Sequence, residues 1–271
     1  MDRFIDARDL TLLSNDRYTF SVLSRILREP CELVLSDHAR LILCHSEPRY
    51  PIWLWTPDDA APEEVARAWA MLTRARSPEV GFRCNLKRPL AERFLNMARA
   101  QGAPADIIMR LCAYECTAPL PPAVPADGAP YRCGEEDVEE IASLLERFNP
   151  AVGEAPLGKA LSEQQARDYV ETGAFYLWKD AAGTTVACCG CRAPVDGLAR
   201  IGPVYTLPEH RRRHYAQSLV HHATCAALAA GWAVMLYTNG DYAASNACYR
   251  GIGYELKGEL CTLAVGKEAQ A

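Results

Sequence analysis

The sequence predicts an α/β protein, of the α+β kind with a mixed sheet, built in two consecutive halves. Three observations predict this class. Apolar patterns typical of strands and of helices alternate along the chain, and a proline-rich segment divides it near the middle. In the second half, a β-branched run leads through a basic turn into a long helix. We predict an N-terminal α/β domain at residues 1–118, a linker at 119–130 and a second domain at 131–271.

The first half is predicted to contain a helical segment, three strands, and then a helix, a strand, a helix and a strand. The helix predicted from residue 62 carries proline and two acids in its first turn, which is typical of a helix start. The expected elements, in order, are residues 1–30, 31–35, 39–44, 50–55, 62–72, 80–86, 89–100 and 107–116.

The second half is predicted to follow the same order after residue 175. A strand at 131–133 and a helix with its apolar face at Val138, Ile141 and Leu145 precede it. Residues 149–161 are expected to be a loop, and Ser162 with Gln165 suggests a capping box for the next helix. An antiparallel meander, a helix ended by Gly231, a strand and a short helix complete the half: residues 175–179, 184–192, 199–206, 211–230, 232–238 and 245–249.

Composition limits the classes of function. The net charge of −5 argues against a general nucleic-acid-binding protein, because neutralising phosphates needs a basic surface. There is neither an apolar run long enough to span a membrane nor a signal-like N-terminus, so we expect a cytoplasmic protein that does not bind membranes. The 12 cysteines are then expected to be reduced. The densest group, Cys188, Cys189 and Cys191, lacks paired ligand spacing, so we predict no metal site.

The chemistry is expected where Arg211, Arg212 and Arg213 meet the helix that follows. The first amides of a helix have no intrahelical partner, and the helix dipole adds partial positive charge there. We place the three arginines in the first helical turn, where they oppose the dipole and so do not stabilise the helix. Amides and arginines together form an anion site suited to a diphosphate, although a solvated basic turn is the simpler alternative.

This segment resembles the acyl-coenzyme A motif of the GNAT superfamily of N-acetyltransferases, which reads Arg/Gln-x-x-Gly-x-Gly/Ala at a strand–helix junction. Arg211 fills the first position and Ala216 the last. His214 replaces the middle glycine, and Arg212 stands where many members have another glycine. A histidine at this place either crowds a diphosphate or donates a hydrogen bond to it.

A second block strengthens the resemblance. The family closes with a short helix that carries Asn and Tyr and ends at a Gly-aromatic strand, and the matching residues here are Ser245, Asn246, Tyr249, Gly253 and Tyr254. Tyr242 stands where asparagine is common. The resemblance covers the chain from about residue 131. It implies a GNAT-like acyltransferase fold, and the element order of the first half suggests a degenerate second copy at residues 1–116, which we expect to bind no cofactor because acids start its helix.

The resemblance implies a transferase that uses acetyl-CoA or another acyl-CoA and acts on a primary amine of a small molecule or an amino acid. Tyr249 is the expected general acid, because a phenol with a pKa near 10 can protonate a departing thiolate. Backbone groups of residues 204–206 are expected to hold the pantetheine arm. The cofactor-binding residues so implied are Val204, Tyr205, Thr206, Arg211, Arg212, Arg213, His214, Tyr215, Ala216 and Asn246.

The general base, the acceptor, the acyl chain length and the oligomeric state stay open, with a homodimer as one option. Glu154, Asp196, His221, His222 and a water-relayed base are the alternatives for the base. Two other functions also remain. A non-catalytic acyl-CoA-binding module would bind acetyl-CoA without releasing thiol, whereas a structural or partner-binding protein with a relic fold would not bind acetyl-CoA.

Overall fold

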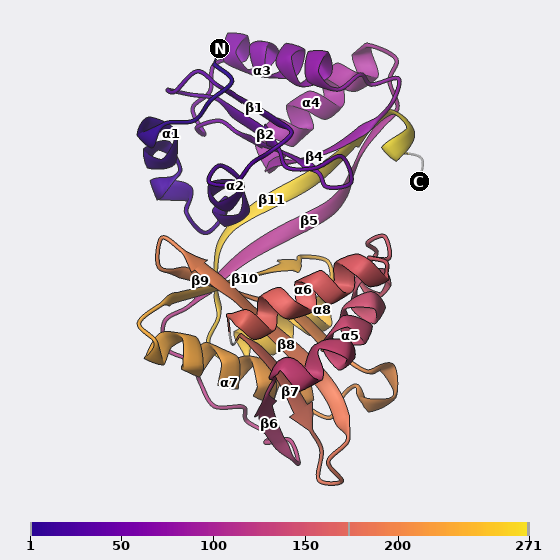
Figure 1. Cartoon of the computed structure of the whole chain (residues 1–271). Coiled ribbons are helices and arrows are strands. Elements are labelled where there is room, and N and C mark those ends of the chain that lie inside the picture. The colour runs from indigo at the N-terminus through magenta and orange to yellow at the C-terminus, as the bar shows by residue number, and fades with distance from the viewer. Residues whose placement is uncertain (1, 173, 270–271) are drawn as a thin grey trace. The chain divides into compact units, whose positions relative to one another are not determined.

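The computed structural model describes residues 2–172 and 174–269, and the chain forms two compact units (Figure 1). Unit 1 contains residues 2–113, 238–242 and 257–269, and unit 2 contains residues 114–237 and 243–256. Residues 238–242 and 257–269, which the sequence assigns to the second domain, therefore cluster with unit 1. Strands β5 (Ala105–Cys116) and β11 (Glu255–Val265) contribute residues to both units.

Unit 1 has the strand order β1-β2-β3-β4-β11-β5. β1 pairs antiparallel with β2 and β2 with β3, while β3 pairs parallel with β4 across the helix that joins them. One face of that helix, formed by Val65, Trp69 and Leu72, is buried in the core. The helix that joins β3 and β4 is α3 (Pro62–Ala75). The remaining elements are α1 (Ala7–Leu12), α2 (Ser21–Ile26), β1 (Leu33–Ser36), β2 (Ile42–His45), β3 (Ile52–Trp55), β4 (Phe82–Lys87) and α4 (Arg88–Ala100).

Unit 2 has the strand order β5-β10-β9-β8-β7-β6. β7, β8 and β9 form the predicted antiparallel meander, and β9 pairs parallel with β10 across α7. Its elements are β6 (Ala129–Arg132), α5 (Val138–Ala151), α6 (Lys159–Glu171), β7 (Phe175–Lys179), β8 (Thr185–Val195), β9 (Leu198–Thr206), α7 (Tyr215–Ala229), β10 (Ala233–Asn239) and α8 (Ala243–Arg250).

Helices cover both faces of the unit 2 sheet. Cys188 and Tyr205 pack into a core with α5 and α6, which lie side by side (Figure 1). Successive strand residues point to opposite faces. Tyr176, one residue from the α5/α6 core residue Phe175, accordingly meets His222 of α7 with ring centroids 5.2 Å apart. α5 and α6 therefore cover one face and α7 the other.

The two units share an element order: helices, three antiparallel strands, a helix, a parallel strand, a helix and a final strand. The degenerate N-terminal copy stays a prediction, which this order supports. The starts of α3 and α7, the helices that follow the third antiparallel strand of each unit, differ in a way that affects anion binding. The Glu64 carboxylate accepts a hydrogen bond from the N-cap amide of α3, Ala61, at 2.8 Å.

Two local predictions are wrong. Ser162 does not cap its helix, because α6 already starts at Lys159 after Gly158, whose φ of 68° suits glycine. Ser162 is buried inside the helix instead, and its hydroxyl donates to the Glu146 carboxylate of α5 at 2.9 Å. The expected loop at 149–161 is correspondingly shorter, because helix occupies its ends. Among the described residues there is no helix of the length and apolarity that crossing a membrane requires, and the cysteines are unbridged.

Candidate functional site

The C-terminal half of β9 offers an open backbone edge. The Leu207 amide donates to the Val186 carbonyl at 3.0 Å, and the β8–β9 register pairs Tyr205 with Cys188. Because hydrogen-bonded and non-hydrogen-bonded pairs alternate in antiparallel strands, Val204 and Thr206 turn their N–H and C=O groups away from β8. Over the described part of the chain, β10 pairs with β9 only along residues 198–201. The strands thus separate beyond Ile201.

Tyr205 differs from its two neighbours. By the same alternation its backbone faces Cys188 inside the sheet, and its buried ring packs edge-on against Phe148, with centroids 6.4 Å apart. The sequence predicts that backbone groups of residues 204–206 bind the pantetheine arm. Only Val204 and Thr206 turn these groups towards the open edge. A peptide-like chain laid along this edge would find polar groups of only these two residues.

The turn before α7 has an unusual backbone. Arg212 and His214 adopt left-handed conformations, with φ values of 61° and 63°. His214 is the N-cap of α7, and its side chain makes no capping hydrogen bond, so this helix start is called uncapped below. The arginines precede the helix, so their predicted placement in its first turn is wrong: an N-cap with positive φ delays the helix to Tyr215. The two positions where the resembling motif has glycine keep a glycine-like conformation without glycine.

The three arginines have different surroundings. Arg211 reaches back to β9, where its Nε donates to the Thr206 carbonyl at 3.4 Å. Arg212 is exposed and makes no side-chain ion pair with the rest of the described chain. The guanidinium of Arg213 lies 3.6 Å from the Asp127 carboxylate and 5.1 Å from the centre of the Tyr215 ring. Arg211 and Arg212 are thus placed for an anion, whereas Arg213 is partly neutralised.

Tyr215 is a core residue. Its side chain is 1% exposed, and its hydroxyl donates to Asp127 at 2.7 Å. The Trp178 indole donates to the Asp127 carbonyl at 2.7 Å, so this part of the predicted linker is packed onto unit 2. The side chain of Tyr215 is buried and already hydrogen-bonded to Asp127. Its backbone amide, at the start of the helix, is the group that remains for a cofactor. Ala216 likewise brings an amide of the first turn.

Tyr249 lies on α8, on the face opposite α5 and α6. It is 8% exposed, near the Cys189 and Cys248 thiols, and its ring centre lies 6.0 Å from that of Tyr254. Burial raises the pKa of its phenol well above the ordinary value, and a hydrogen bond with Ser245 acts in the opposite direction. Cys189 is paired with Val204, so this phenol is near the strand position where the open edge begins.

Asn246 is held by its neighbours. The Tyr114 hydroxyl donates to its Oδ1 at 2.9 Å and accepts from Arg250 at 2.9 Å. The residue is buried. This chain of hydrogen bonds fixes the start of α8, so the structure gives Asn246 a structural partner in addition to the cofactor contact that the sequence predicts.

Tyr169 of α6 approaches the same strand from the other face. Its hydroxyl donates to the Gly202 carbonyl at 2.9 Å, and the Arg192 guanidinium lies 5.0 Å from the centre of its ring. A Cβ on Gly190 would lie 2.8 Å from the Tyr169 ring and 2.9 Å from the Gly202 carbonyl oxygen. The strand partners of Tyr169, to which no local motif points, could not be read from the sequence.

The comparison with known proteins decides the family of this region. The model of the acetyltransferase (GNAT) family matches residues 138–254. The matched span includes the open β9 edge, the uncapped start of α7 and Tyr249.

The C-terminal half carries a GNAT acetyltransferase domain.

The match supports an N-acetyltransferase, and the matched family uses acyl-CoA as its co-substrate. Solved structures share the fold over almost the whole chain. A GCN5-related N-acetyltransferase from Sphaerobacter thermophilus is 13% identical, with a TM-score of 0.69, and 97% of this chain covers 94% of that one. One from Kribbella flavida is 20% identical, with a TM-score of 0.64 and coverages of 93% and 95%.

An acetyltransferase of the GNAT family from Colwellia psychrerythraea is 12% identical, with a TM-score of 0.60 and coverages of 97% and 98%. At these identities the likeness shows the fold alone. No protein of curated function is significantly similar in sequence. The mixed α/β GNAT fold predicted from the sequence is confirmed.

The candidate bases of the acetyltransferase domain lie on several different elements. His221 contacts the Cys225 thiol at 3.6 Å, and both line a pocket of about 310 Å³ between α7 and the proline-rich segment. Burial lowers the pKa of His222, whose ring packs edge-on against Tyr176. Asp196 is an exposed residue of the β8–β9 turn, and Glu154 follows α5.

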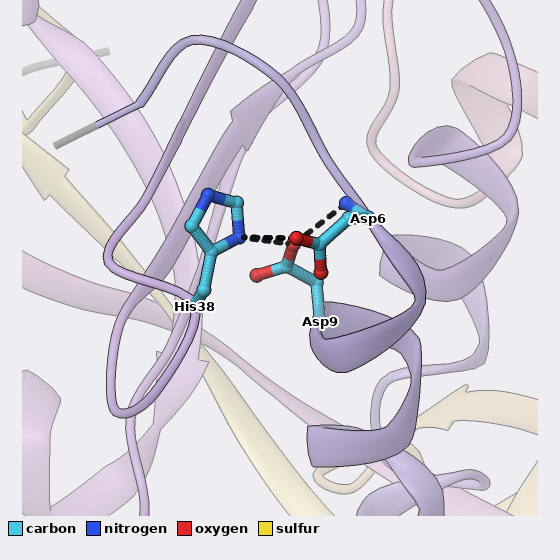
Figure 2. A group of neighbouring side chains, drawn as sticks. All are labelled: Asp6, Asp9 and His38. Atoms are coloured by element: carbon cyan, nitrogen blue, oxygen red, sulfur yellow. Dashed lines mark hydrogen bonds and ion pairs between the residues drawn. The ribbon is translucent and has the colours of Figure 1, made fainter.

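Unit 1 contains a separate polar cluster, shown in Figure 2, formed by Asp6, Asp9 and His38. The Nδ1 of His38 lies 2.7 Å from the Asp9 carboxylate, and its Nε2 lies 3.0 Å from Asp2. Asp9 is fully buried and also accepts hydrogen bonds from the Ser36 hydroxyl and the Asp6 amide. Protein donors thus already surround its carboxylate. The cluster fastens the N-terminal segment to the β1–β2 turn.

Proposed function

We propose that the protein transfers an acyl group, in the first instance acetyl, from acyl-CoA to a primary amine of a small molecule or amino acid. The amine attacks the thioester directly. The proposal is supported by three features found together around β9: the uncapped start of α7, the open backbone edge of Val204 and Thr206, and the buried phenol of Tyr249.

The diphosphate is assigned to the turn before α7. Its amides and the helix dipole attract an anion, and Arg211 and Arg212 add positive charge that has no acidic partner within the described residues. The amide-rich pantetheine arm then continues along β9 like an added strand, hydrogen-bonded to Val204 and Thr206. The distance from Thr206 to Gly202 is roughly 13 Å at about 3.3 Å per residue, so the arm carries the thioester towards Gly202.

Tyr249 is assigned the role of general acid. Its raised pKa keeps the phenol protonated throughout the neutral range, so it is always available as a donor. The same shift makes full proton transfer less favourable. The donor therefore acts chiefly by hydrogen-bonding the sulfur as negative charge develops there, and water exclusion strengthens that bond. Deprotonation of the amine is assigned to water, because His221 lies against Cys225 and His222 against Tyr176.

A second candidate is the non-catalytic acyl-CoA-binding module. The burial of Tyr249 favours it, because only 8% of this residue is exposed. Binding without turnover would also agree with the position of the candidate bases. The two functions differ in one measurable property, the release of free thiol from acetyl-CoA in the presence of an amine.

The deciding experiment combines calorimetry with a thiol-release assay over a panel of primary amines. We expect acetyl-CoA to bind and at least one amine to release thiol. Tyr249→Phe should lower turnover strongly while leaving the Kd for acetyl-CoA near normal. Tyr254→Phe is the matched control, because it removes a buried hydroxyl that bonds to Thr224 at 2.6 Å. Equal turnover in both variants would remove Tyr249 from the acid role, and binding without thiol release from any amine would favour the second candidate.

A further inference from the structure

Two arginines face each other on the strand pair that leads into the open edge. Arg192 of β8 and Arg200 of β9 occupy directly opposite register positions. Side chains at such positions lie on one face with Cβ atoms about 5 Å apart, so one anion can lie within reach of both guanidinium groups. Both residues are only partly buried, so solvent and small solutes can reach them.

The arginine pair lies on the α5/α6 face. Arg192 stacks over Tyr169 of α6, with its guanidinium carbon 5.0 Å from the ring centre. The charge of Arg200 also reaches Tyr169: burial raises the pKa of that phenol, and the two guanidiniums act against the shift. Tyr169 in turn hydrogen-bonds Gly202, where β9 separates from β10. The positive charge is therefore concentrated beside the point where the strands part.

This position corresponds to the acceptor side of the proposed reaction. The pantetheine arm would approach along β9 from Thr206 towards Gly202, so residues before Gly202 lie beyond its acyl end. Tyr249, near Cys189, belongs to the opposite face. An amine that enters from the α5/α6 face would thus meet the thioester from the side opposite the proposed acid, with Arg192 and Arg200 around its remaining atoms.

We propose that the acceptor carries a carboxylate next to its amine, and that Arg192 and Arg200 bind this carboxylate. The inference rests on the proposed transferase function. Guanidinium groups match carboxylates in a bidentate geometry, so two of them on one face suit the binding of this group. Amino acids are the class of acceptor that this arrangement selects, in preference to neutral amines and polyamines.

The test uses the full chain, acetyl-CoA and a panel of amino acids, each paired with its own neutral amide, together with a diamine. Thiol release gives kcat and KM for each acceptor. We expect kcat/KM to be at least about 10-fold higher for the acid than for the matching amide. Arg192→Gln and Arg200→Gln should each lower kcat/KM for the acid by about 10- to 100-fold, mainly through KM, as expected for loss of a charge-assisted hydrogen bond. Activity with the amide and the KM for acetyl-CoA should not change.

Arg167→Gln is the control for loss of one positive charge on the same face of the domain. Arg167 lies on α6 and pairs with Glu163 at 3.5 Å, away from the opposed pair. The Arg167→Gln variant should have the same kcat/KM as the wild type. Thermal unfolding of the variants checks that each of them is folded under the assay conditions.

The outcomes separate the two levels of the argument. If amides or diamines are acetylated as efficiently as the amino acids, the carboxylate inference is overturned. The transferase proposal then stays in place. Arg192→Gln and Arg200→Gln variants that lose activity equally with acids and amides would also overturn it. If no acceptor of any charge releases thiol, the proposed function itself fails.

Discussion

Replacing His214 by glycine should stabilise the acetyltransferase domain and preserve its anion site. His214 has a φ of 63°, a left-handed conformation that costs a residue with a Cβ about 1–2 kcal/mol. Glycine avoids this cost but loses about 0.5–1 kcal/mol through the greater freedom of the unfolded chain. The difference is roughly 0–1.5 kcal/mol in favour of His214→Gly, which for a domain of this size raises the Tm by up to about 6 °C.

The assay is thermal unfolding of the wild type, His214→Gly and His214→Ala, each followed by calorimetry with acetyl-CoA. His214→Ala is the matched control, because it removes the imidazole and keeps the Cβ that causes the strain. We expect no gain in Tm for alanine. The Kd for acetyl-CoA should be retained in His214→Gly, because the amides keep their positions at the helix start.

A His214→Gly variant that unfolds at a lower temperature than His214→Ala would refute the reasoning. It would mean that the left-handed conformation is not what limits stability at this turn. A large loss of acetyl-CoA affinity in both variants, by contrast, would show that the imidazole itself binds the cofactor, and the account of amides as the main ligands would then be wrong.

Three further predictions concern other parts of the chain. Gly190→Ala should destabilise the protein by about 1–3 kcal/mol in urea unfolding, because its Cβ would lie 2.8 Å from the Tyr169 ring; a neutral substitution would contradict the close packing. Arg211→Ala combined with Arg212→Ala should weaken acetyl-CoA binding by about 1–3 kcal/mol in calorimetry, and an unchanged Kd would place the diphosphate elsewhere. A hydrogen bond to Asp9 raises the pKa of His38 above 6.5, so its stabilising effect is present below pH 6.5 and is lost as pH rises through the raised pKa. The Tm gap between wild type and His38→Asn, which tolerates the φ of 55° there, should therefore shrink with rising pH; a gap that grows would contradict this sign.

Much of the fold could be predicted from local patterns. The strand–turn–helix around residues 199–230 has a β-branched run, a basic turn and Gly231 after the helix, and each of these acts over a few residues. The α3 start was readable for the same reason, since proline and acids mark it. Ser162 shows the limit: the Ser–Gln spacing of a capping box occurs inside α6, where packing against α5 decides the helix start.

The site was less predictable because its decisive features are non-local. The left-handed φ values of Arg212 and His214 contradict the usual preference of these residues, so the sequence alone does not predict that the turn keeps a glycine-like backbone. Asp127 lies in a segment that composition marks as a linker, yet it binds Tyr215 and Arg213. The opposed pair of Arg192 and Arg200 arises only from the β8–β9 register, which includes two irregularities that spacing does not reveal.

The most direct test of the central claim is a crystal structure of the chain with bound acetyl-CoA. We predict that the diphosphate lies within hydrogen-bond distance of amides in residues 211–216, that the pantetheine arm pairs with Val204 and Thr206, and that the sulfur lies beside the Tyr249 hydroxyl. A diphosphate bound away from the start of α7, or a sulfur out of reach of that hydroxyl, would contradict the account.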